Sequence, residues 1–175
     1  MVKSRADLII GIDPDREKSG VALLDTTSLK FMSLQTLPFP ELLEFLMYHR
    51  DMADRVTKKS LKVVVEAGWL NLKSNFHGYY GQRGEKIAKD VGANHETGKK
   101  IIEMCRHWGI DVEEKKPLAL QFHGFNLWKG KDGKITHEEF VELTGWSKQT
   151  NPEKRDAGLI AWDAAKLPTR INKRR

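Results

Sequence analysis

The sequence predicts an α/β domain built around one mixed β-sheet. Three short apolar runs follow one another near the start of the chain, and a valine-rich run, LKVVVE, comes later. Segments with helical periodicity separate and follow these runs, which is typical of a sheet covered by helices. The chain has 175 residues, which is enough for one domain with a real core.

The first three strands are expected to form an antiparallel meander. They occupy Leu8–Asp13, residues 20–25 and residues 29–36. Pro14 and Gly20 suit the first connection, and the second is only three residues long. A short connection of this kind joins antiparallel neighbours in a sheet.

The middle of the chain alternates between helix and strand. Residues 38–50 are predicted to be a helix, because Leu42, Phe45 and Leu46 share one face. Leu61–Glu66 is predicted to be a fourth strand that is buried on both sides. A second helix is expected over residues 96–108, and Gly109 ends it.

The remaining segments complete the sheet and its cover. Residues 67–91 contain four glycines and are expected to be irregular, and residues 110–114 suit a fifth strand. Thr136 and Glu139 have the spacing of a helix capping box. Asn151 and Pro152 suit the start of a last helix. We therefore expect one domain over residues 1–168, followed by a basic tail at 169–175.

Composition favours a basic protein that does not enter a membrane. The formal net charge is +6, which suits a polyanionic partner. The single cysteine, Cys105, cannot form an internal disulfide. The apolar run near the N-terminus is too short for a signal peptide or a membrane span. A soluble cytoplasmic protein is expected.

Acidic residues occur at four places that suggest a metal site. Asp13 and Glu66 each end an apolar strand, and Glu153 and Asp156 lie on one face of the last helix. Carboxylates at such positions need a partner or a cation. A site with oxygen ligands alone suits Mg²⁺ or Mn²⁺ better than zinc.

Each acid also has an ordinary interpretation. Asp13 could be a turn residue, and Glu153 and Asp156 could favour the dipole of the helix that they begin. Glu66 is the hardest to explain in this way, since it directly follows three valines.

Three motifs together resemble the RuvC family of Holliday junction resolvases, which are RNase H-like nucleases. The segments are GIDPDREKSGVALLD, VVVEAGW and NPEKRDAG, in the order in which that family has them. The family's acids match Asp13, Glu66 and Asp156. Two positions depart from its pattern: Asp15 stands where Gly is usual, and Glu153 stands where Asp or His is usual.

The resemblance implies a fold, a chemistry and an assembly. The fold is an RNase H-like mixed five-stranded sheet with antiparallel first three strands, flanked by helices. The activity is a metal-dependent endonuclease that cuts four-way DNA junctions by paired nicks, leaving 5′-phosphate ends. Two Mg²⁺ ions, for which Mn²⁺ could substitute, would be bound by Asp13, Glu66, Glu153 and Asp156. A homodimer of bacterial or phage origin is also implied.

A second set of residues is expected to bind DNA. Residues 67–91 mix aromatic and basic side chains, which suits phosphate binding and base stacking. The candidates are Trp69, Lys73, Arg83, Lys86 and Lys89. Aromatic residues of this segment could instead pack on the core of the domain. Lys134 could contact the scissile phosphate or merely precede a helix.

Other functions stay open at this point. The same acids could serve an RNase H-like nuclease that cuts RNA–DNA hybrids, flaps or branched phage DNA. A catalytically inactive protein that binds branched DNA is a further alternative. A phosphotransferase of the actin or sugar-kinase type is excluded, because the chain is too short for its second half.

Overall fold

The computed structural model of the chain describes residues 6–71 and 81–169. Its centre is a five-stranded sheet in the order β3-β2-β1-β4-β5. The strands are β1 (Leu8–Asp13), β2 (Ser19–Asp25), β3 (Lys30–Leu37), β4 (Leu61–Glu66) and β5 (Asp111–Lys115). β1, β2 and β3 pair antiparallel, whereas β4 pairs parallel with both β1 and β5. The predicted mixed sheet with an antiparallel beginning is confirmed.

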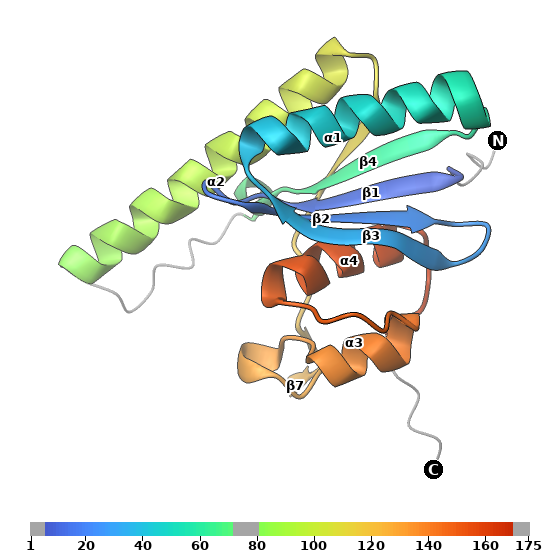
Figure 1. Cartoon of the computed structure of the whole chain (residues 1–175). Helices are drawn as coiled ribbons and strands as arrows, with labels where there is room; N and C mark the ends of the chain where they lie inside the picture. The colour runs from blue at the N-terminus through green and yellow to red at the C-terminus, as the bar shows by residue number, and fades with distance from the viewer. Residues whose placement is uncertain (1–5, 72–80, 170–175) are drawn as a thin grey trace.

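Two helices cover one face of the sheet (Figure 1). They are α1 (Phe39–Asp51), which continues into a π-helical turn at Met52–Thr57, and α2 (Gln82–His107). Leu42, Leu46, Ile101 and Cys105 are fully buried against the strand residues of this face. The predicted apolar faces of both helices are thus confirmed, and Cys105 belongs to the core.

The helix α2 begins much earlier than predicted. It starts at Gln82, so the expectation that residues 67–91 are irregular is wrong from residue 82 onward. Glycine lowers helix propensity by only about 1 kcal/mol, and Gly92 lies on the exposed surface. The N-terminal half of α2 extends past the sheet (Figure 1) and has few apolar residues, so it carries no helical periodicity.

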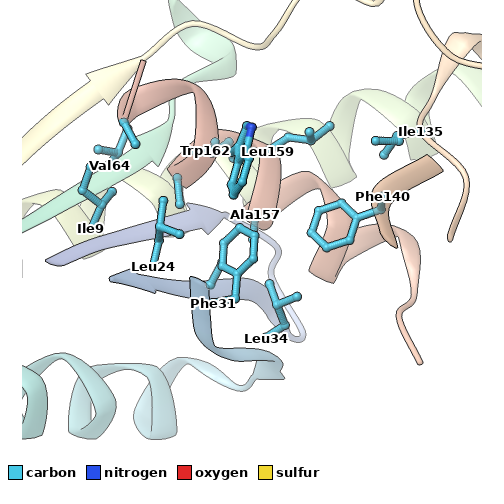
Figure 2. Packing of buried hydrophobic residues seen from close by; sticks show 14 of the residues in the cluster. Ile9, Leu24, Phe31, Leu34, Val64, Ile135, Phe140, Ala157, Leu159 and Trp162 are labelled. Atoms are coloured by element: carbon cyan, nitrogen blue, oxygen red, sulfur yellow. The ribbon is translucent and has the colours of Figure 1, made fainter. Parts of the chain in front are cut away.

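The opposite face of the sheet packs against α4 (Pro152–Ala164) and α3 (His137–Thr144). Figure 2 shows the aromatic part of this core. The ring centre of Phe31 on β3 lies 5.8 Å from that of Phe140 and 5.9 Å from that of Trp162. These rings join β3 to the two C-terminal helices, which lie far from it in sequence.

The predicted starts of both C-terminal helices are confirmed. Thr136 accepts a hydrogen bond from the backbone N–H of Glu139, and the Glu139 side chain accepts one from the backbone of Thr136. Asn151 accepts a hydrogen bond from the backbone N–H of Lys154, directly before Pro152.

A small hairpin that was not predicted lies between β5 and α3. It pairs β6 (Gln121–Phe122) with β7 (Phe125–Asn126). His123 and Gly124 form its turn, and both have positive φ angles, 49° and 80°. That conformation is typical of two-residue hairpin turns. Short 3₁₀ turns occur at Gly68–Leu70 and Lys131–Gly133.

Candidate active site

Asp13 and Glu66 lie side by side at one edge of the sheet. β1 and β4 are parallel neighbours, and Ile12 pairs with Val65. The next residue of each strand is an acid, so the two carboxylates leave the sheet at the same edge. Side chains alternate along a strand. Because Val64 packs in the core on the α4 side, Glu66 points to that same side.

The helix α4 brings Asp156 to these two acids. Two glycines let α4 approach the sheet closely: Gly11 on β1 faces the backbone of Ala157, and Gly20 on β2 faces the backbone of Glu153. A methyl group at either position would overlap those backbone atoms. Asp156 therefore begins α4 at the strand ends where the other acids lie.

Lys134 is the cation of this cluster. Its Nζ lies 2.7 Å from Oδ2 of Asp156 and donates a hydrogen bond to it. Half of the Lys134 side chain is exposed, whereas the exposed fraction of Asp156 is 22%. The charges of Asp13 and Glu66 also act on Lys134, so three carboxylates face one ammonium group and leave an excess of negative charge.

Burial and neighbouring negative charges raise the pKa values of two of the acids, Asp13 and Glu66. Burial and then the negative charges of Glu66 and Asp156 raise the pKa of Asp13 well above its ordinary value, against the opposing charge of Lys134. Burial and the charge of Asp156 raise the pKa of Glu66 to about 6. The site therefore resists holding all of its carboxylates ionised without a further cation.

The pKa of Lys134 is also raised. Burial acts to lower it, but the hydrogen bond to Asp156 and the charges of Asp156, Asp13 and Glu66 outweigh this effect. Lys134 therefore keeps its positive charge at neutral pH. Sequence reasoning built this cluster from acids alone. Lys134 lies in it and also precedes α3, and its expected contact with the scissile phosphate stays a prediction.

Asp15, which departs from the family's pattern, has a structural role. Its carboxylate accepts hydrogen bonds from the backbone N–H groups of Glu17 and Lys18, at 2.8 and 3.2 Å. It also accepts one from the Asn94 side chain on α2, at 3.4 Å. Asp15 therefore forms the turn after β1, a role that was considered for Asp13.

Glu153 lies near the cluster but faces another hollow. Its charge contributes to the raised pKa of Asp13, although less than burial and the charges of Glu66 and Asp156. Its side chain lines a hollow with Asp15, Lys18 and Thr36 on the β2 side of the turn. Its expected part in metal binding stays a prediction.

A cleft of about 150 Å³ opens beside Asp13 and Glu66. Trp69, Asn94 and His95 line it from the opposite wall. Sequence reasoning missed Asn94 and His95, because they lie before the expected start of the second helix at residue 96, whereas α2 already includes them. Only the length of α2 brings them to the strand ends.

Trp69 forms one wall of this cleft and also packs on the fold. Its ring contacts His95 edge-on at 5.7 Å between centres, and its Nε1–H donates a hydrogen bond to Glu114 at 3.2 Å. Trp69 is half-buried: part of its ring packs on the domain, as one interpretation expected, and part is open to the cleft, where the other expected it to contact DNA.

The other DNA-binding candidates lie away from the acids or outside the described residues. Arg83, Lys86 and Lys89 are exposed on the extended first half of α2. Lys73 lies outside the described residues. Their contact with DNA stays a prediction.

The carboxylate oxygens of Asp13, Glu66 and Asp156 are the type of ligand that a hard divalent cation prefers. Within residues 6–71 and 81–169, no group of three or more His, Cys, Asp or Glu side chains is placed so as to hold a metal ion. The Lys134 ammonium stands among the carboxylates as the counter-charge. Oxygen donors with an excess of negative charge suit Mg²⁺ or Mn²⁺.

Comparison with known proteins gives structural similarities only. No family model and no curated protein matches the sequence. The chain is similar to Thermus thermophilus RuvC in complex with a Holliday junction substrate, with a TM-score of 0.46, 18% identity, and coverage of 88% of this chain and 90% of that one. It is also similar to a second structure of T. thermophilus RuvC (TM-score 0.42, 16% identity, coverage of 88% of this chain and 90% of that one).

A viral protein is also similar in structure. Fowlpox virus resolvase, in complex with Holliday junction DNA, gives a TM-score of 0.44 at 12% identity, with coverage of 91% of this chain and 97% of that one. The chain thus has structural similarity to resolvases from a bacterium and from a virus. No helix of the part that the structure describes is long and apolar enough to cross a membrane.

Proposed function

We propose that the protein is a Mg²⁺-dependent endonuclease that resolves four-way DNA junctions. The observation that carries the proposal is the convergence of Asp13, Glu66 and Asp156 with Lys134, from four separate segments of the chain. Carboxylates whose pKa values are raised by burial and by neighbouring carboxylates, and that lie beside an open cleft, are typical of catalytic sites.

Each residue has a part in this proposal. Asp13, Glu66 and Asp156, with Glu153 assisting, would hold two Mg²⁺ ions. Bound Mg²⁺ would supply Lewis acidity and an activated water for phosphodiester hydrolysis, with Mn²⁺ as a substitute. Lys134 is placed to move from Asp156 to a DNA phosphate, since half of its side chain is exposed.

The test is a panel of substrates with matched metal conditions. Purified protein is incubated with a labelled four-way junction, a linear duplex, a flap and an RNA–DNA hybrid, in Mg²⁺, in Mn²⁺ and in chelator. Paired nicks with 5′-phosphate ends in the junction alone, lost in chelator and in Asp13→Asn, are the expected result. Cutting of the hybrid or the flap alone would contradict junction resolution and retain the nuclease.

A second candidate is a protein that binds branched DNA without cutting it. The Lys134–Asp156 ion pair favours this candidate, because it already neutralises one of the expected metal ligands. Tight junction binding without cleavage in either metal, and without Mn²⁺-dependent stabilisation of the protein, would establish this candidate and exclude the nuclease.

A further inference from the structure

The hairpin β6–β7 presents two aromatic rings to the solvent. The exposed fraction is 47% for Phe122 and 78% for Phe125, and these are among the most exposed large apolar residues of the described chain. The two residues pair directly across the hairpin, so both side chains project from the same face. The ring of His123 lies 4.1 Å from that of Phe122, in an edge-on arrangement.

The base of this hairpin is fixed to the core. The backbone N–H of Leu127 donates to the carbonyl of Leu120 at 2.8 Å, and the Gln121 side chain donates to Asn126 at 3.1 Å. Leu120 and Leu127 pack against the cluster that contains buried Trp128. A rigid base with an exposed aromatic tip loses little freedom when it binds a partner.

The same base forms a wall of the acidic site. A cleft of about 120 Å³ is lined by Leu120 and Trp128 together with Glu66, Lys134 and Asp156. The hairpin therefore starts at the cleft that contains two of the proposed metal ligands. A DNA backbone seated on those acids would pass within reach of the hairpin.

The charge around the hairpin favours nucleic acid over an apolar protein surface. Residues 115–135 contain five lysines and a single acid, Asp132. Lys116, Lys129 and Lys131 are exposed there. Exposed rings among lysines suit a polyanion that also offers aromatic faces.

We infer that the β6–β7 hairpin is a stacking surface for nucleobases exposed at the branch point of the DNA. This inference rests on the proposed function and adds a contact that recognises the branch itself. In a continuous duplex every base is already stacked, whereas bases at a branch can leave the stack and pack on Phe122 and Phe125. The hairpin would thus favour branched over linear DNA.

The test measures stacking without any cleavage. A four-way junction carrying 2-aminopurine at the branch and a linear duplex carrying it at the same sequence position are titrated in chelator. The proteins are the wild type, Phe122→Ala/Phe125→Ala and Phe125→Tyr. Tyr48→Ala is the control, because Tyr48 is an exposed aromatic residue on α1 with an exposed fraction of 60%.

We expect the wild type to quench 2-aminopurine in the junction and not in the duplex. The double alanine variant should lose this quenching and bind the junction at least about five-fold more weakly, with unchanged affinity for the duplex. Phe125→Tyr, which keeps the ring, and Tyr48→Ala should both behave as the wild type does.

Several results would overturn the inference. Unchanged quenching and affinity in the double alanine variant would refute it and leave the nuclease proposal intact. Equal weakening on junction and duplex would make the hairpin a general DNA contact. A change in oligomeric state with unchanged DNA binding would make it a protein interface. Wild-type protein that binds neither DNA would refute both proposals.

Discussion

At the scale of single residues, the candidate site is a cluster in which like charges oppose one another. Asp13 and Glu66 are each raised in pKa by burial and by neighbouring carboxylates, and Lys134 offsets only part of the repulsion. The folded protein thus holds these protons more tightly than the unfolded chain. A group of this kind stabilises the fold at low pH and loses that contribution as it ionises.

Glu66 should therefore make the metal-free protein less stable as the pH rises. Its pKa is about 6 in the folded state against 4.5 unperturbed, so its contribution is complete below pH 4.5 and lost above about pH 6. The shift corresponds to about 2 kcal/mol in the free energy of unfolding. In Glu66→Gln this loss should be absent, as measured by urea unfolding in chelator from pH 4 to pH 8.

The matched control is Glu142→Gln, an exposed acid on α3. The free energy of unfolding of this variant should depend on pH as that of the wild type does. That dependence includes a separate contribution from Asp13, whose pKa is also raised. If the free energy of unfolding of Glu66→Gln and of the wild type changed with pH in the same way, the fold would not destabilise the ionised form of Glu66.

Lys134 should oppose metal binding in the absence of DNA. In Lys134→Met the carboxylates lose their counter-charge, so the free energy of unfolding without metal should fall by about 1 kcal/mol, a small value because the ion pair is half exposed. The stabilisation by Mn²⁺ should increase, because the emptied position favours a cation. Thermal unfolding across a Mn²⁺ titration measures both changes.

Lys131→Met, on the neighbouring 3₁₀ turn, removes an exposed lysine without touching Asp156 and should change neither quantity. Equal Mn²⁺ stabilisation in Lys134→Met and the wild type would argue that Lys134 and the metal do not share a site.

At the scale of elements, the site depends on how closely α4 lies against the sheet. Gly11 and Gly20 allow direct contact between strand and helix backbones, and this contact sets where Asp156 lies relative to Asp13. A side chain there would meet backbone atoms, which cannot move aside as a flexible side chain can.

Gly11→Ala should therefore destabilise the fold and damage the site together. We expect a loss of about 3 kcal/mol in the free energy of unfolding, at the upper end for overpacking, and a loss of Mn²⁺-dependent stabilisation. Gly92→Ala is the control, because nothing lies within 4 Å of a methyl group there and the position is helical. It should gain about 0.5–1 kcal/mol. Chemical denaturation compares the two; similar effects would refute the close-packing argument.

The sequence predicted elements wherever the signal is local. The capping box of Thr136 and Glu139 and the N-cap at Asn151 depend on residues three apart, and both were found at the expected positions. The strands ending in Asp13 and Glu66 were predicted from their apolar runs, and their matching edge follows from parallel pairing.

Other features depend on tertiary contacts that no local pattern carries. The first half of α2 is polar and contains glycines, so its sequence shows no apolar residues at helical spacing. For this reason Asn94 and His95, which line the cleft, were not predicted as site residues. The ion pair of Lys134 with Asp156 joins residues 22 apart in sequence. The hairpin turn at His123 and Gly124 lacks the usual Asn-Gly or Asp-Gly signal.

At the scale of the whole molecule, the proposed reaction requires two sites. Resolution of a four-way junction needs two strands to be cut symmetrically, and a two-fold dimer supplies two related sites. If the protein is the predicted homodimer, one can measure whether both strands are cut within a single complex.

Mixed dimers should separate the two nicks. On a supercoiled plasmid with an extruded cruciform, wild-type protein should give linear DNA, since both strands are cut before the complex dissociates. Wild-type protein mixed with excess Asp13→Asn, after unfolding and refolding together, should give nicked circles instead. Gel electrophoresis resolves the two products. Linear DNA in undiminished proportion from the mixture would contradict a dimer with one site in each subunit.

The chain order of the site has a consequence for the cell that makes this protein. All five strands of the central sheet precede α4, which carries Asp156 and closes the cluster. During synthesis the sheet emerges from the ribosome first, and the last acid of the cluster follows with α4. A nascent chain that stops before α4 therefore lacks an assembled acidic centre, so incomplete copies of the proposed nuclease would not cut branched DNA.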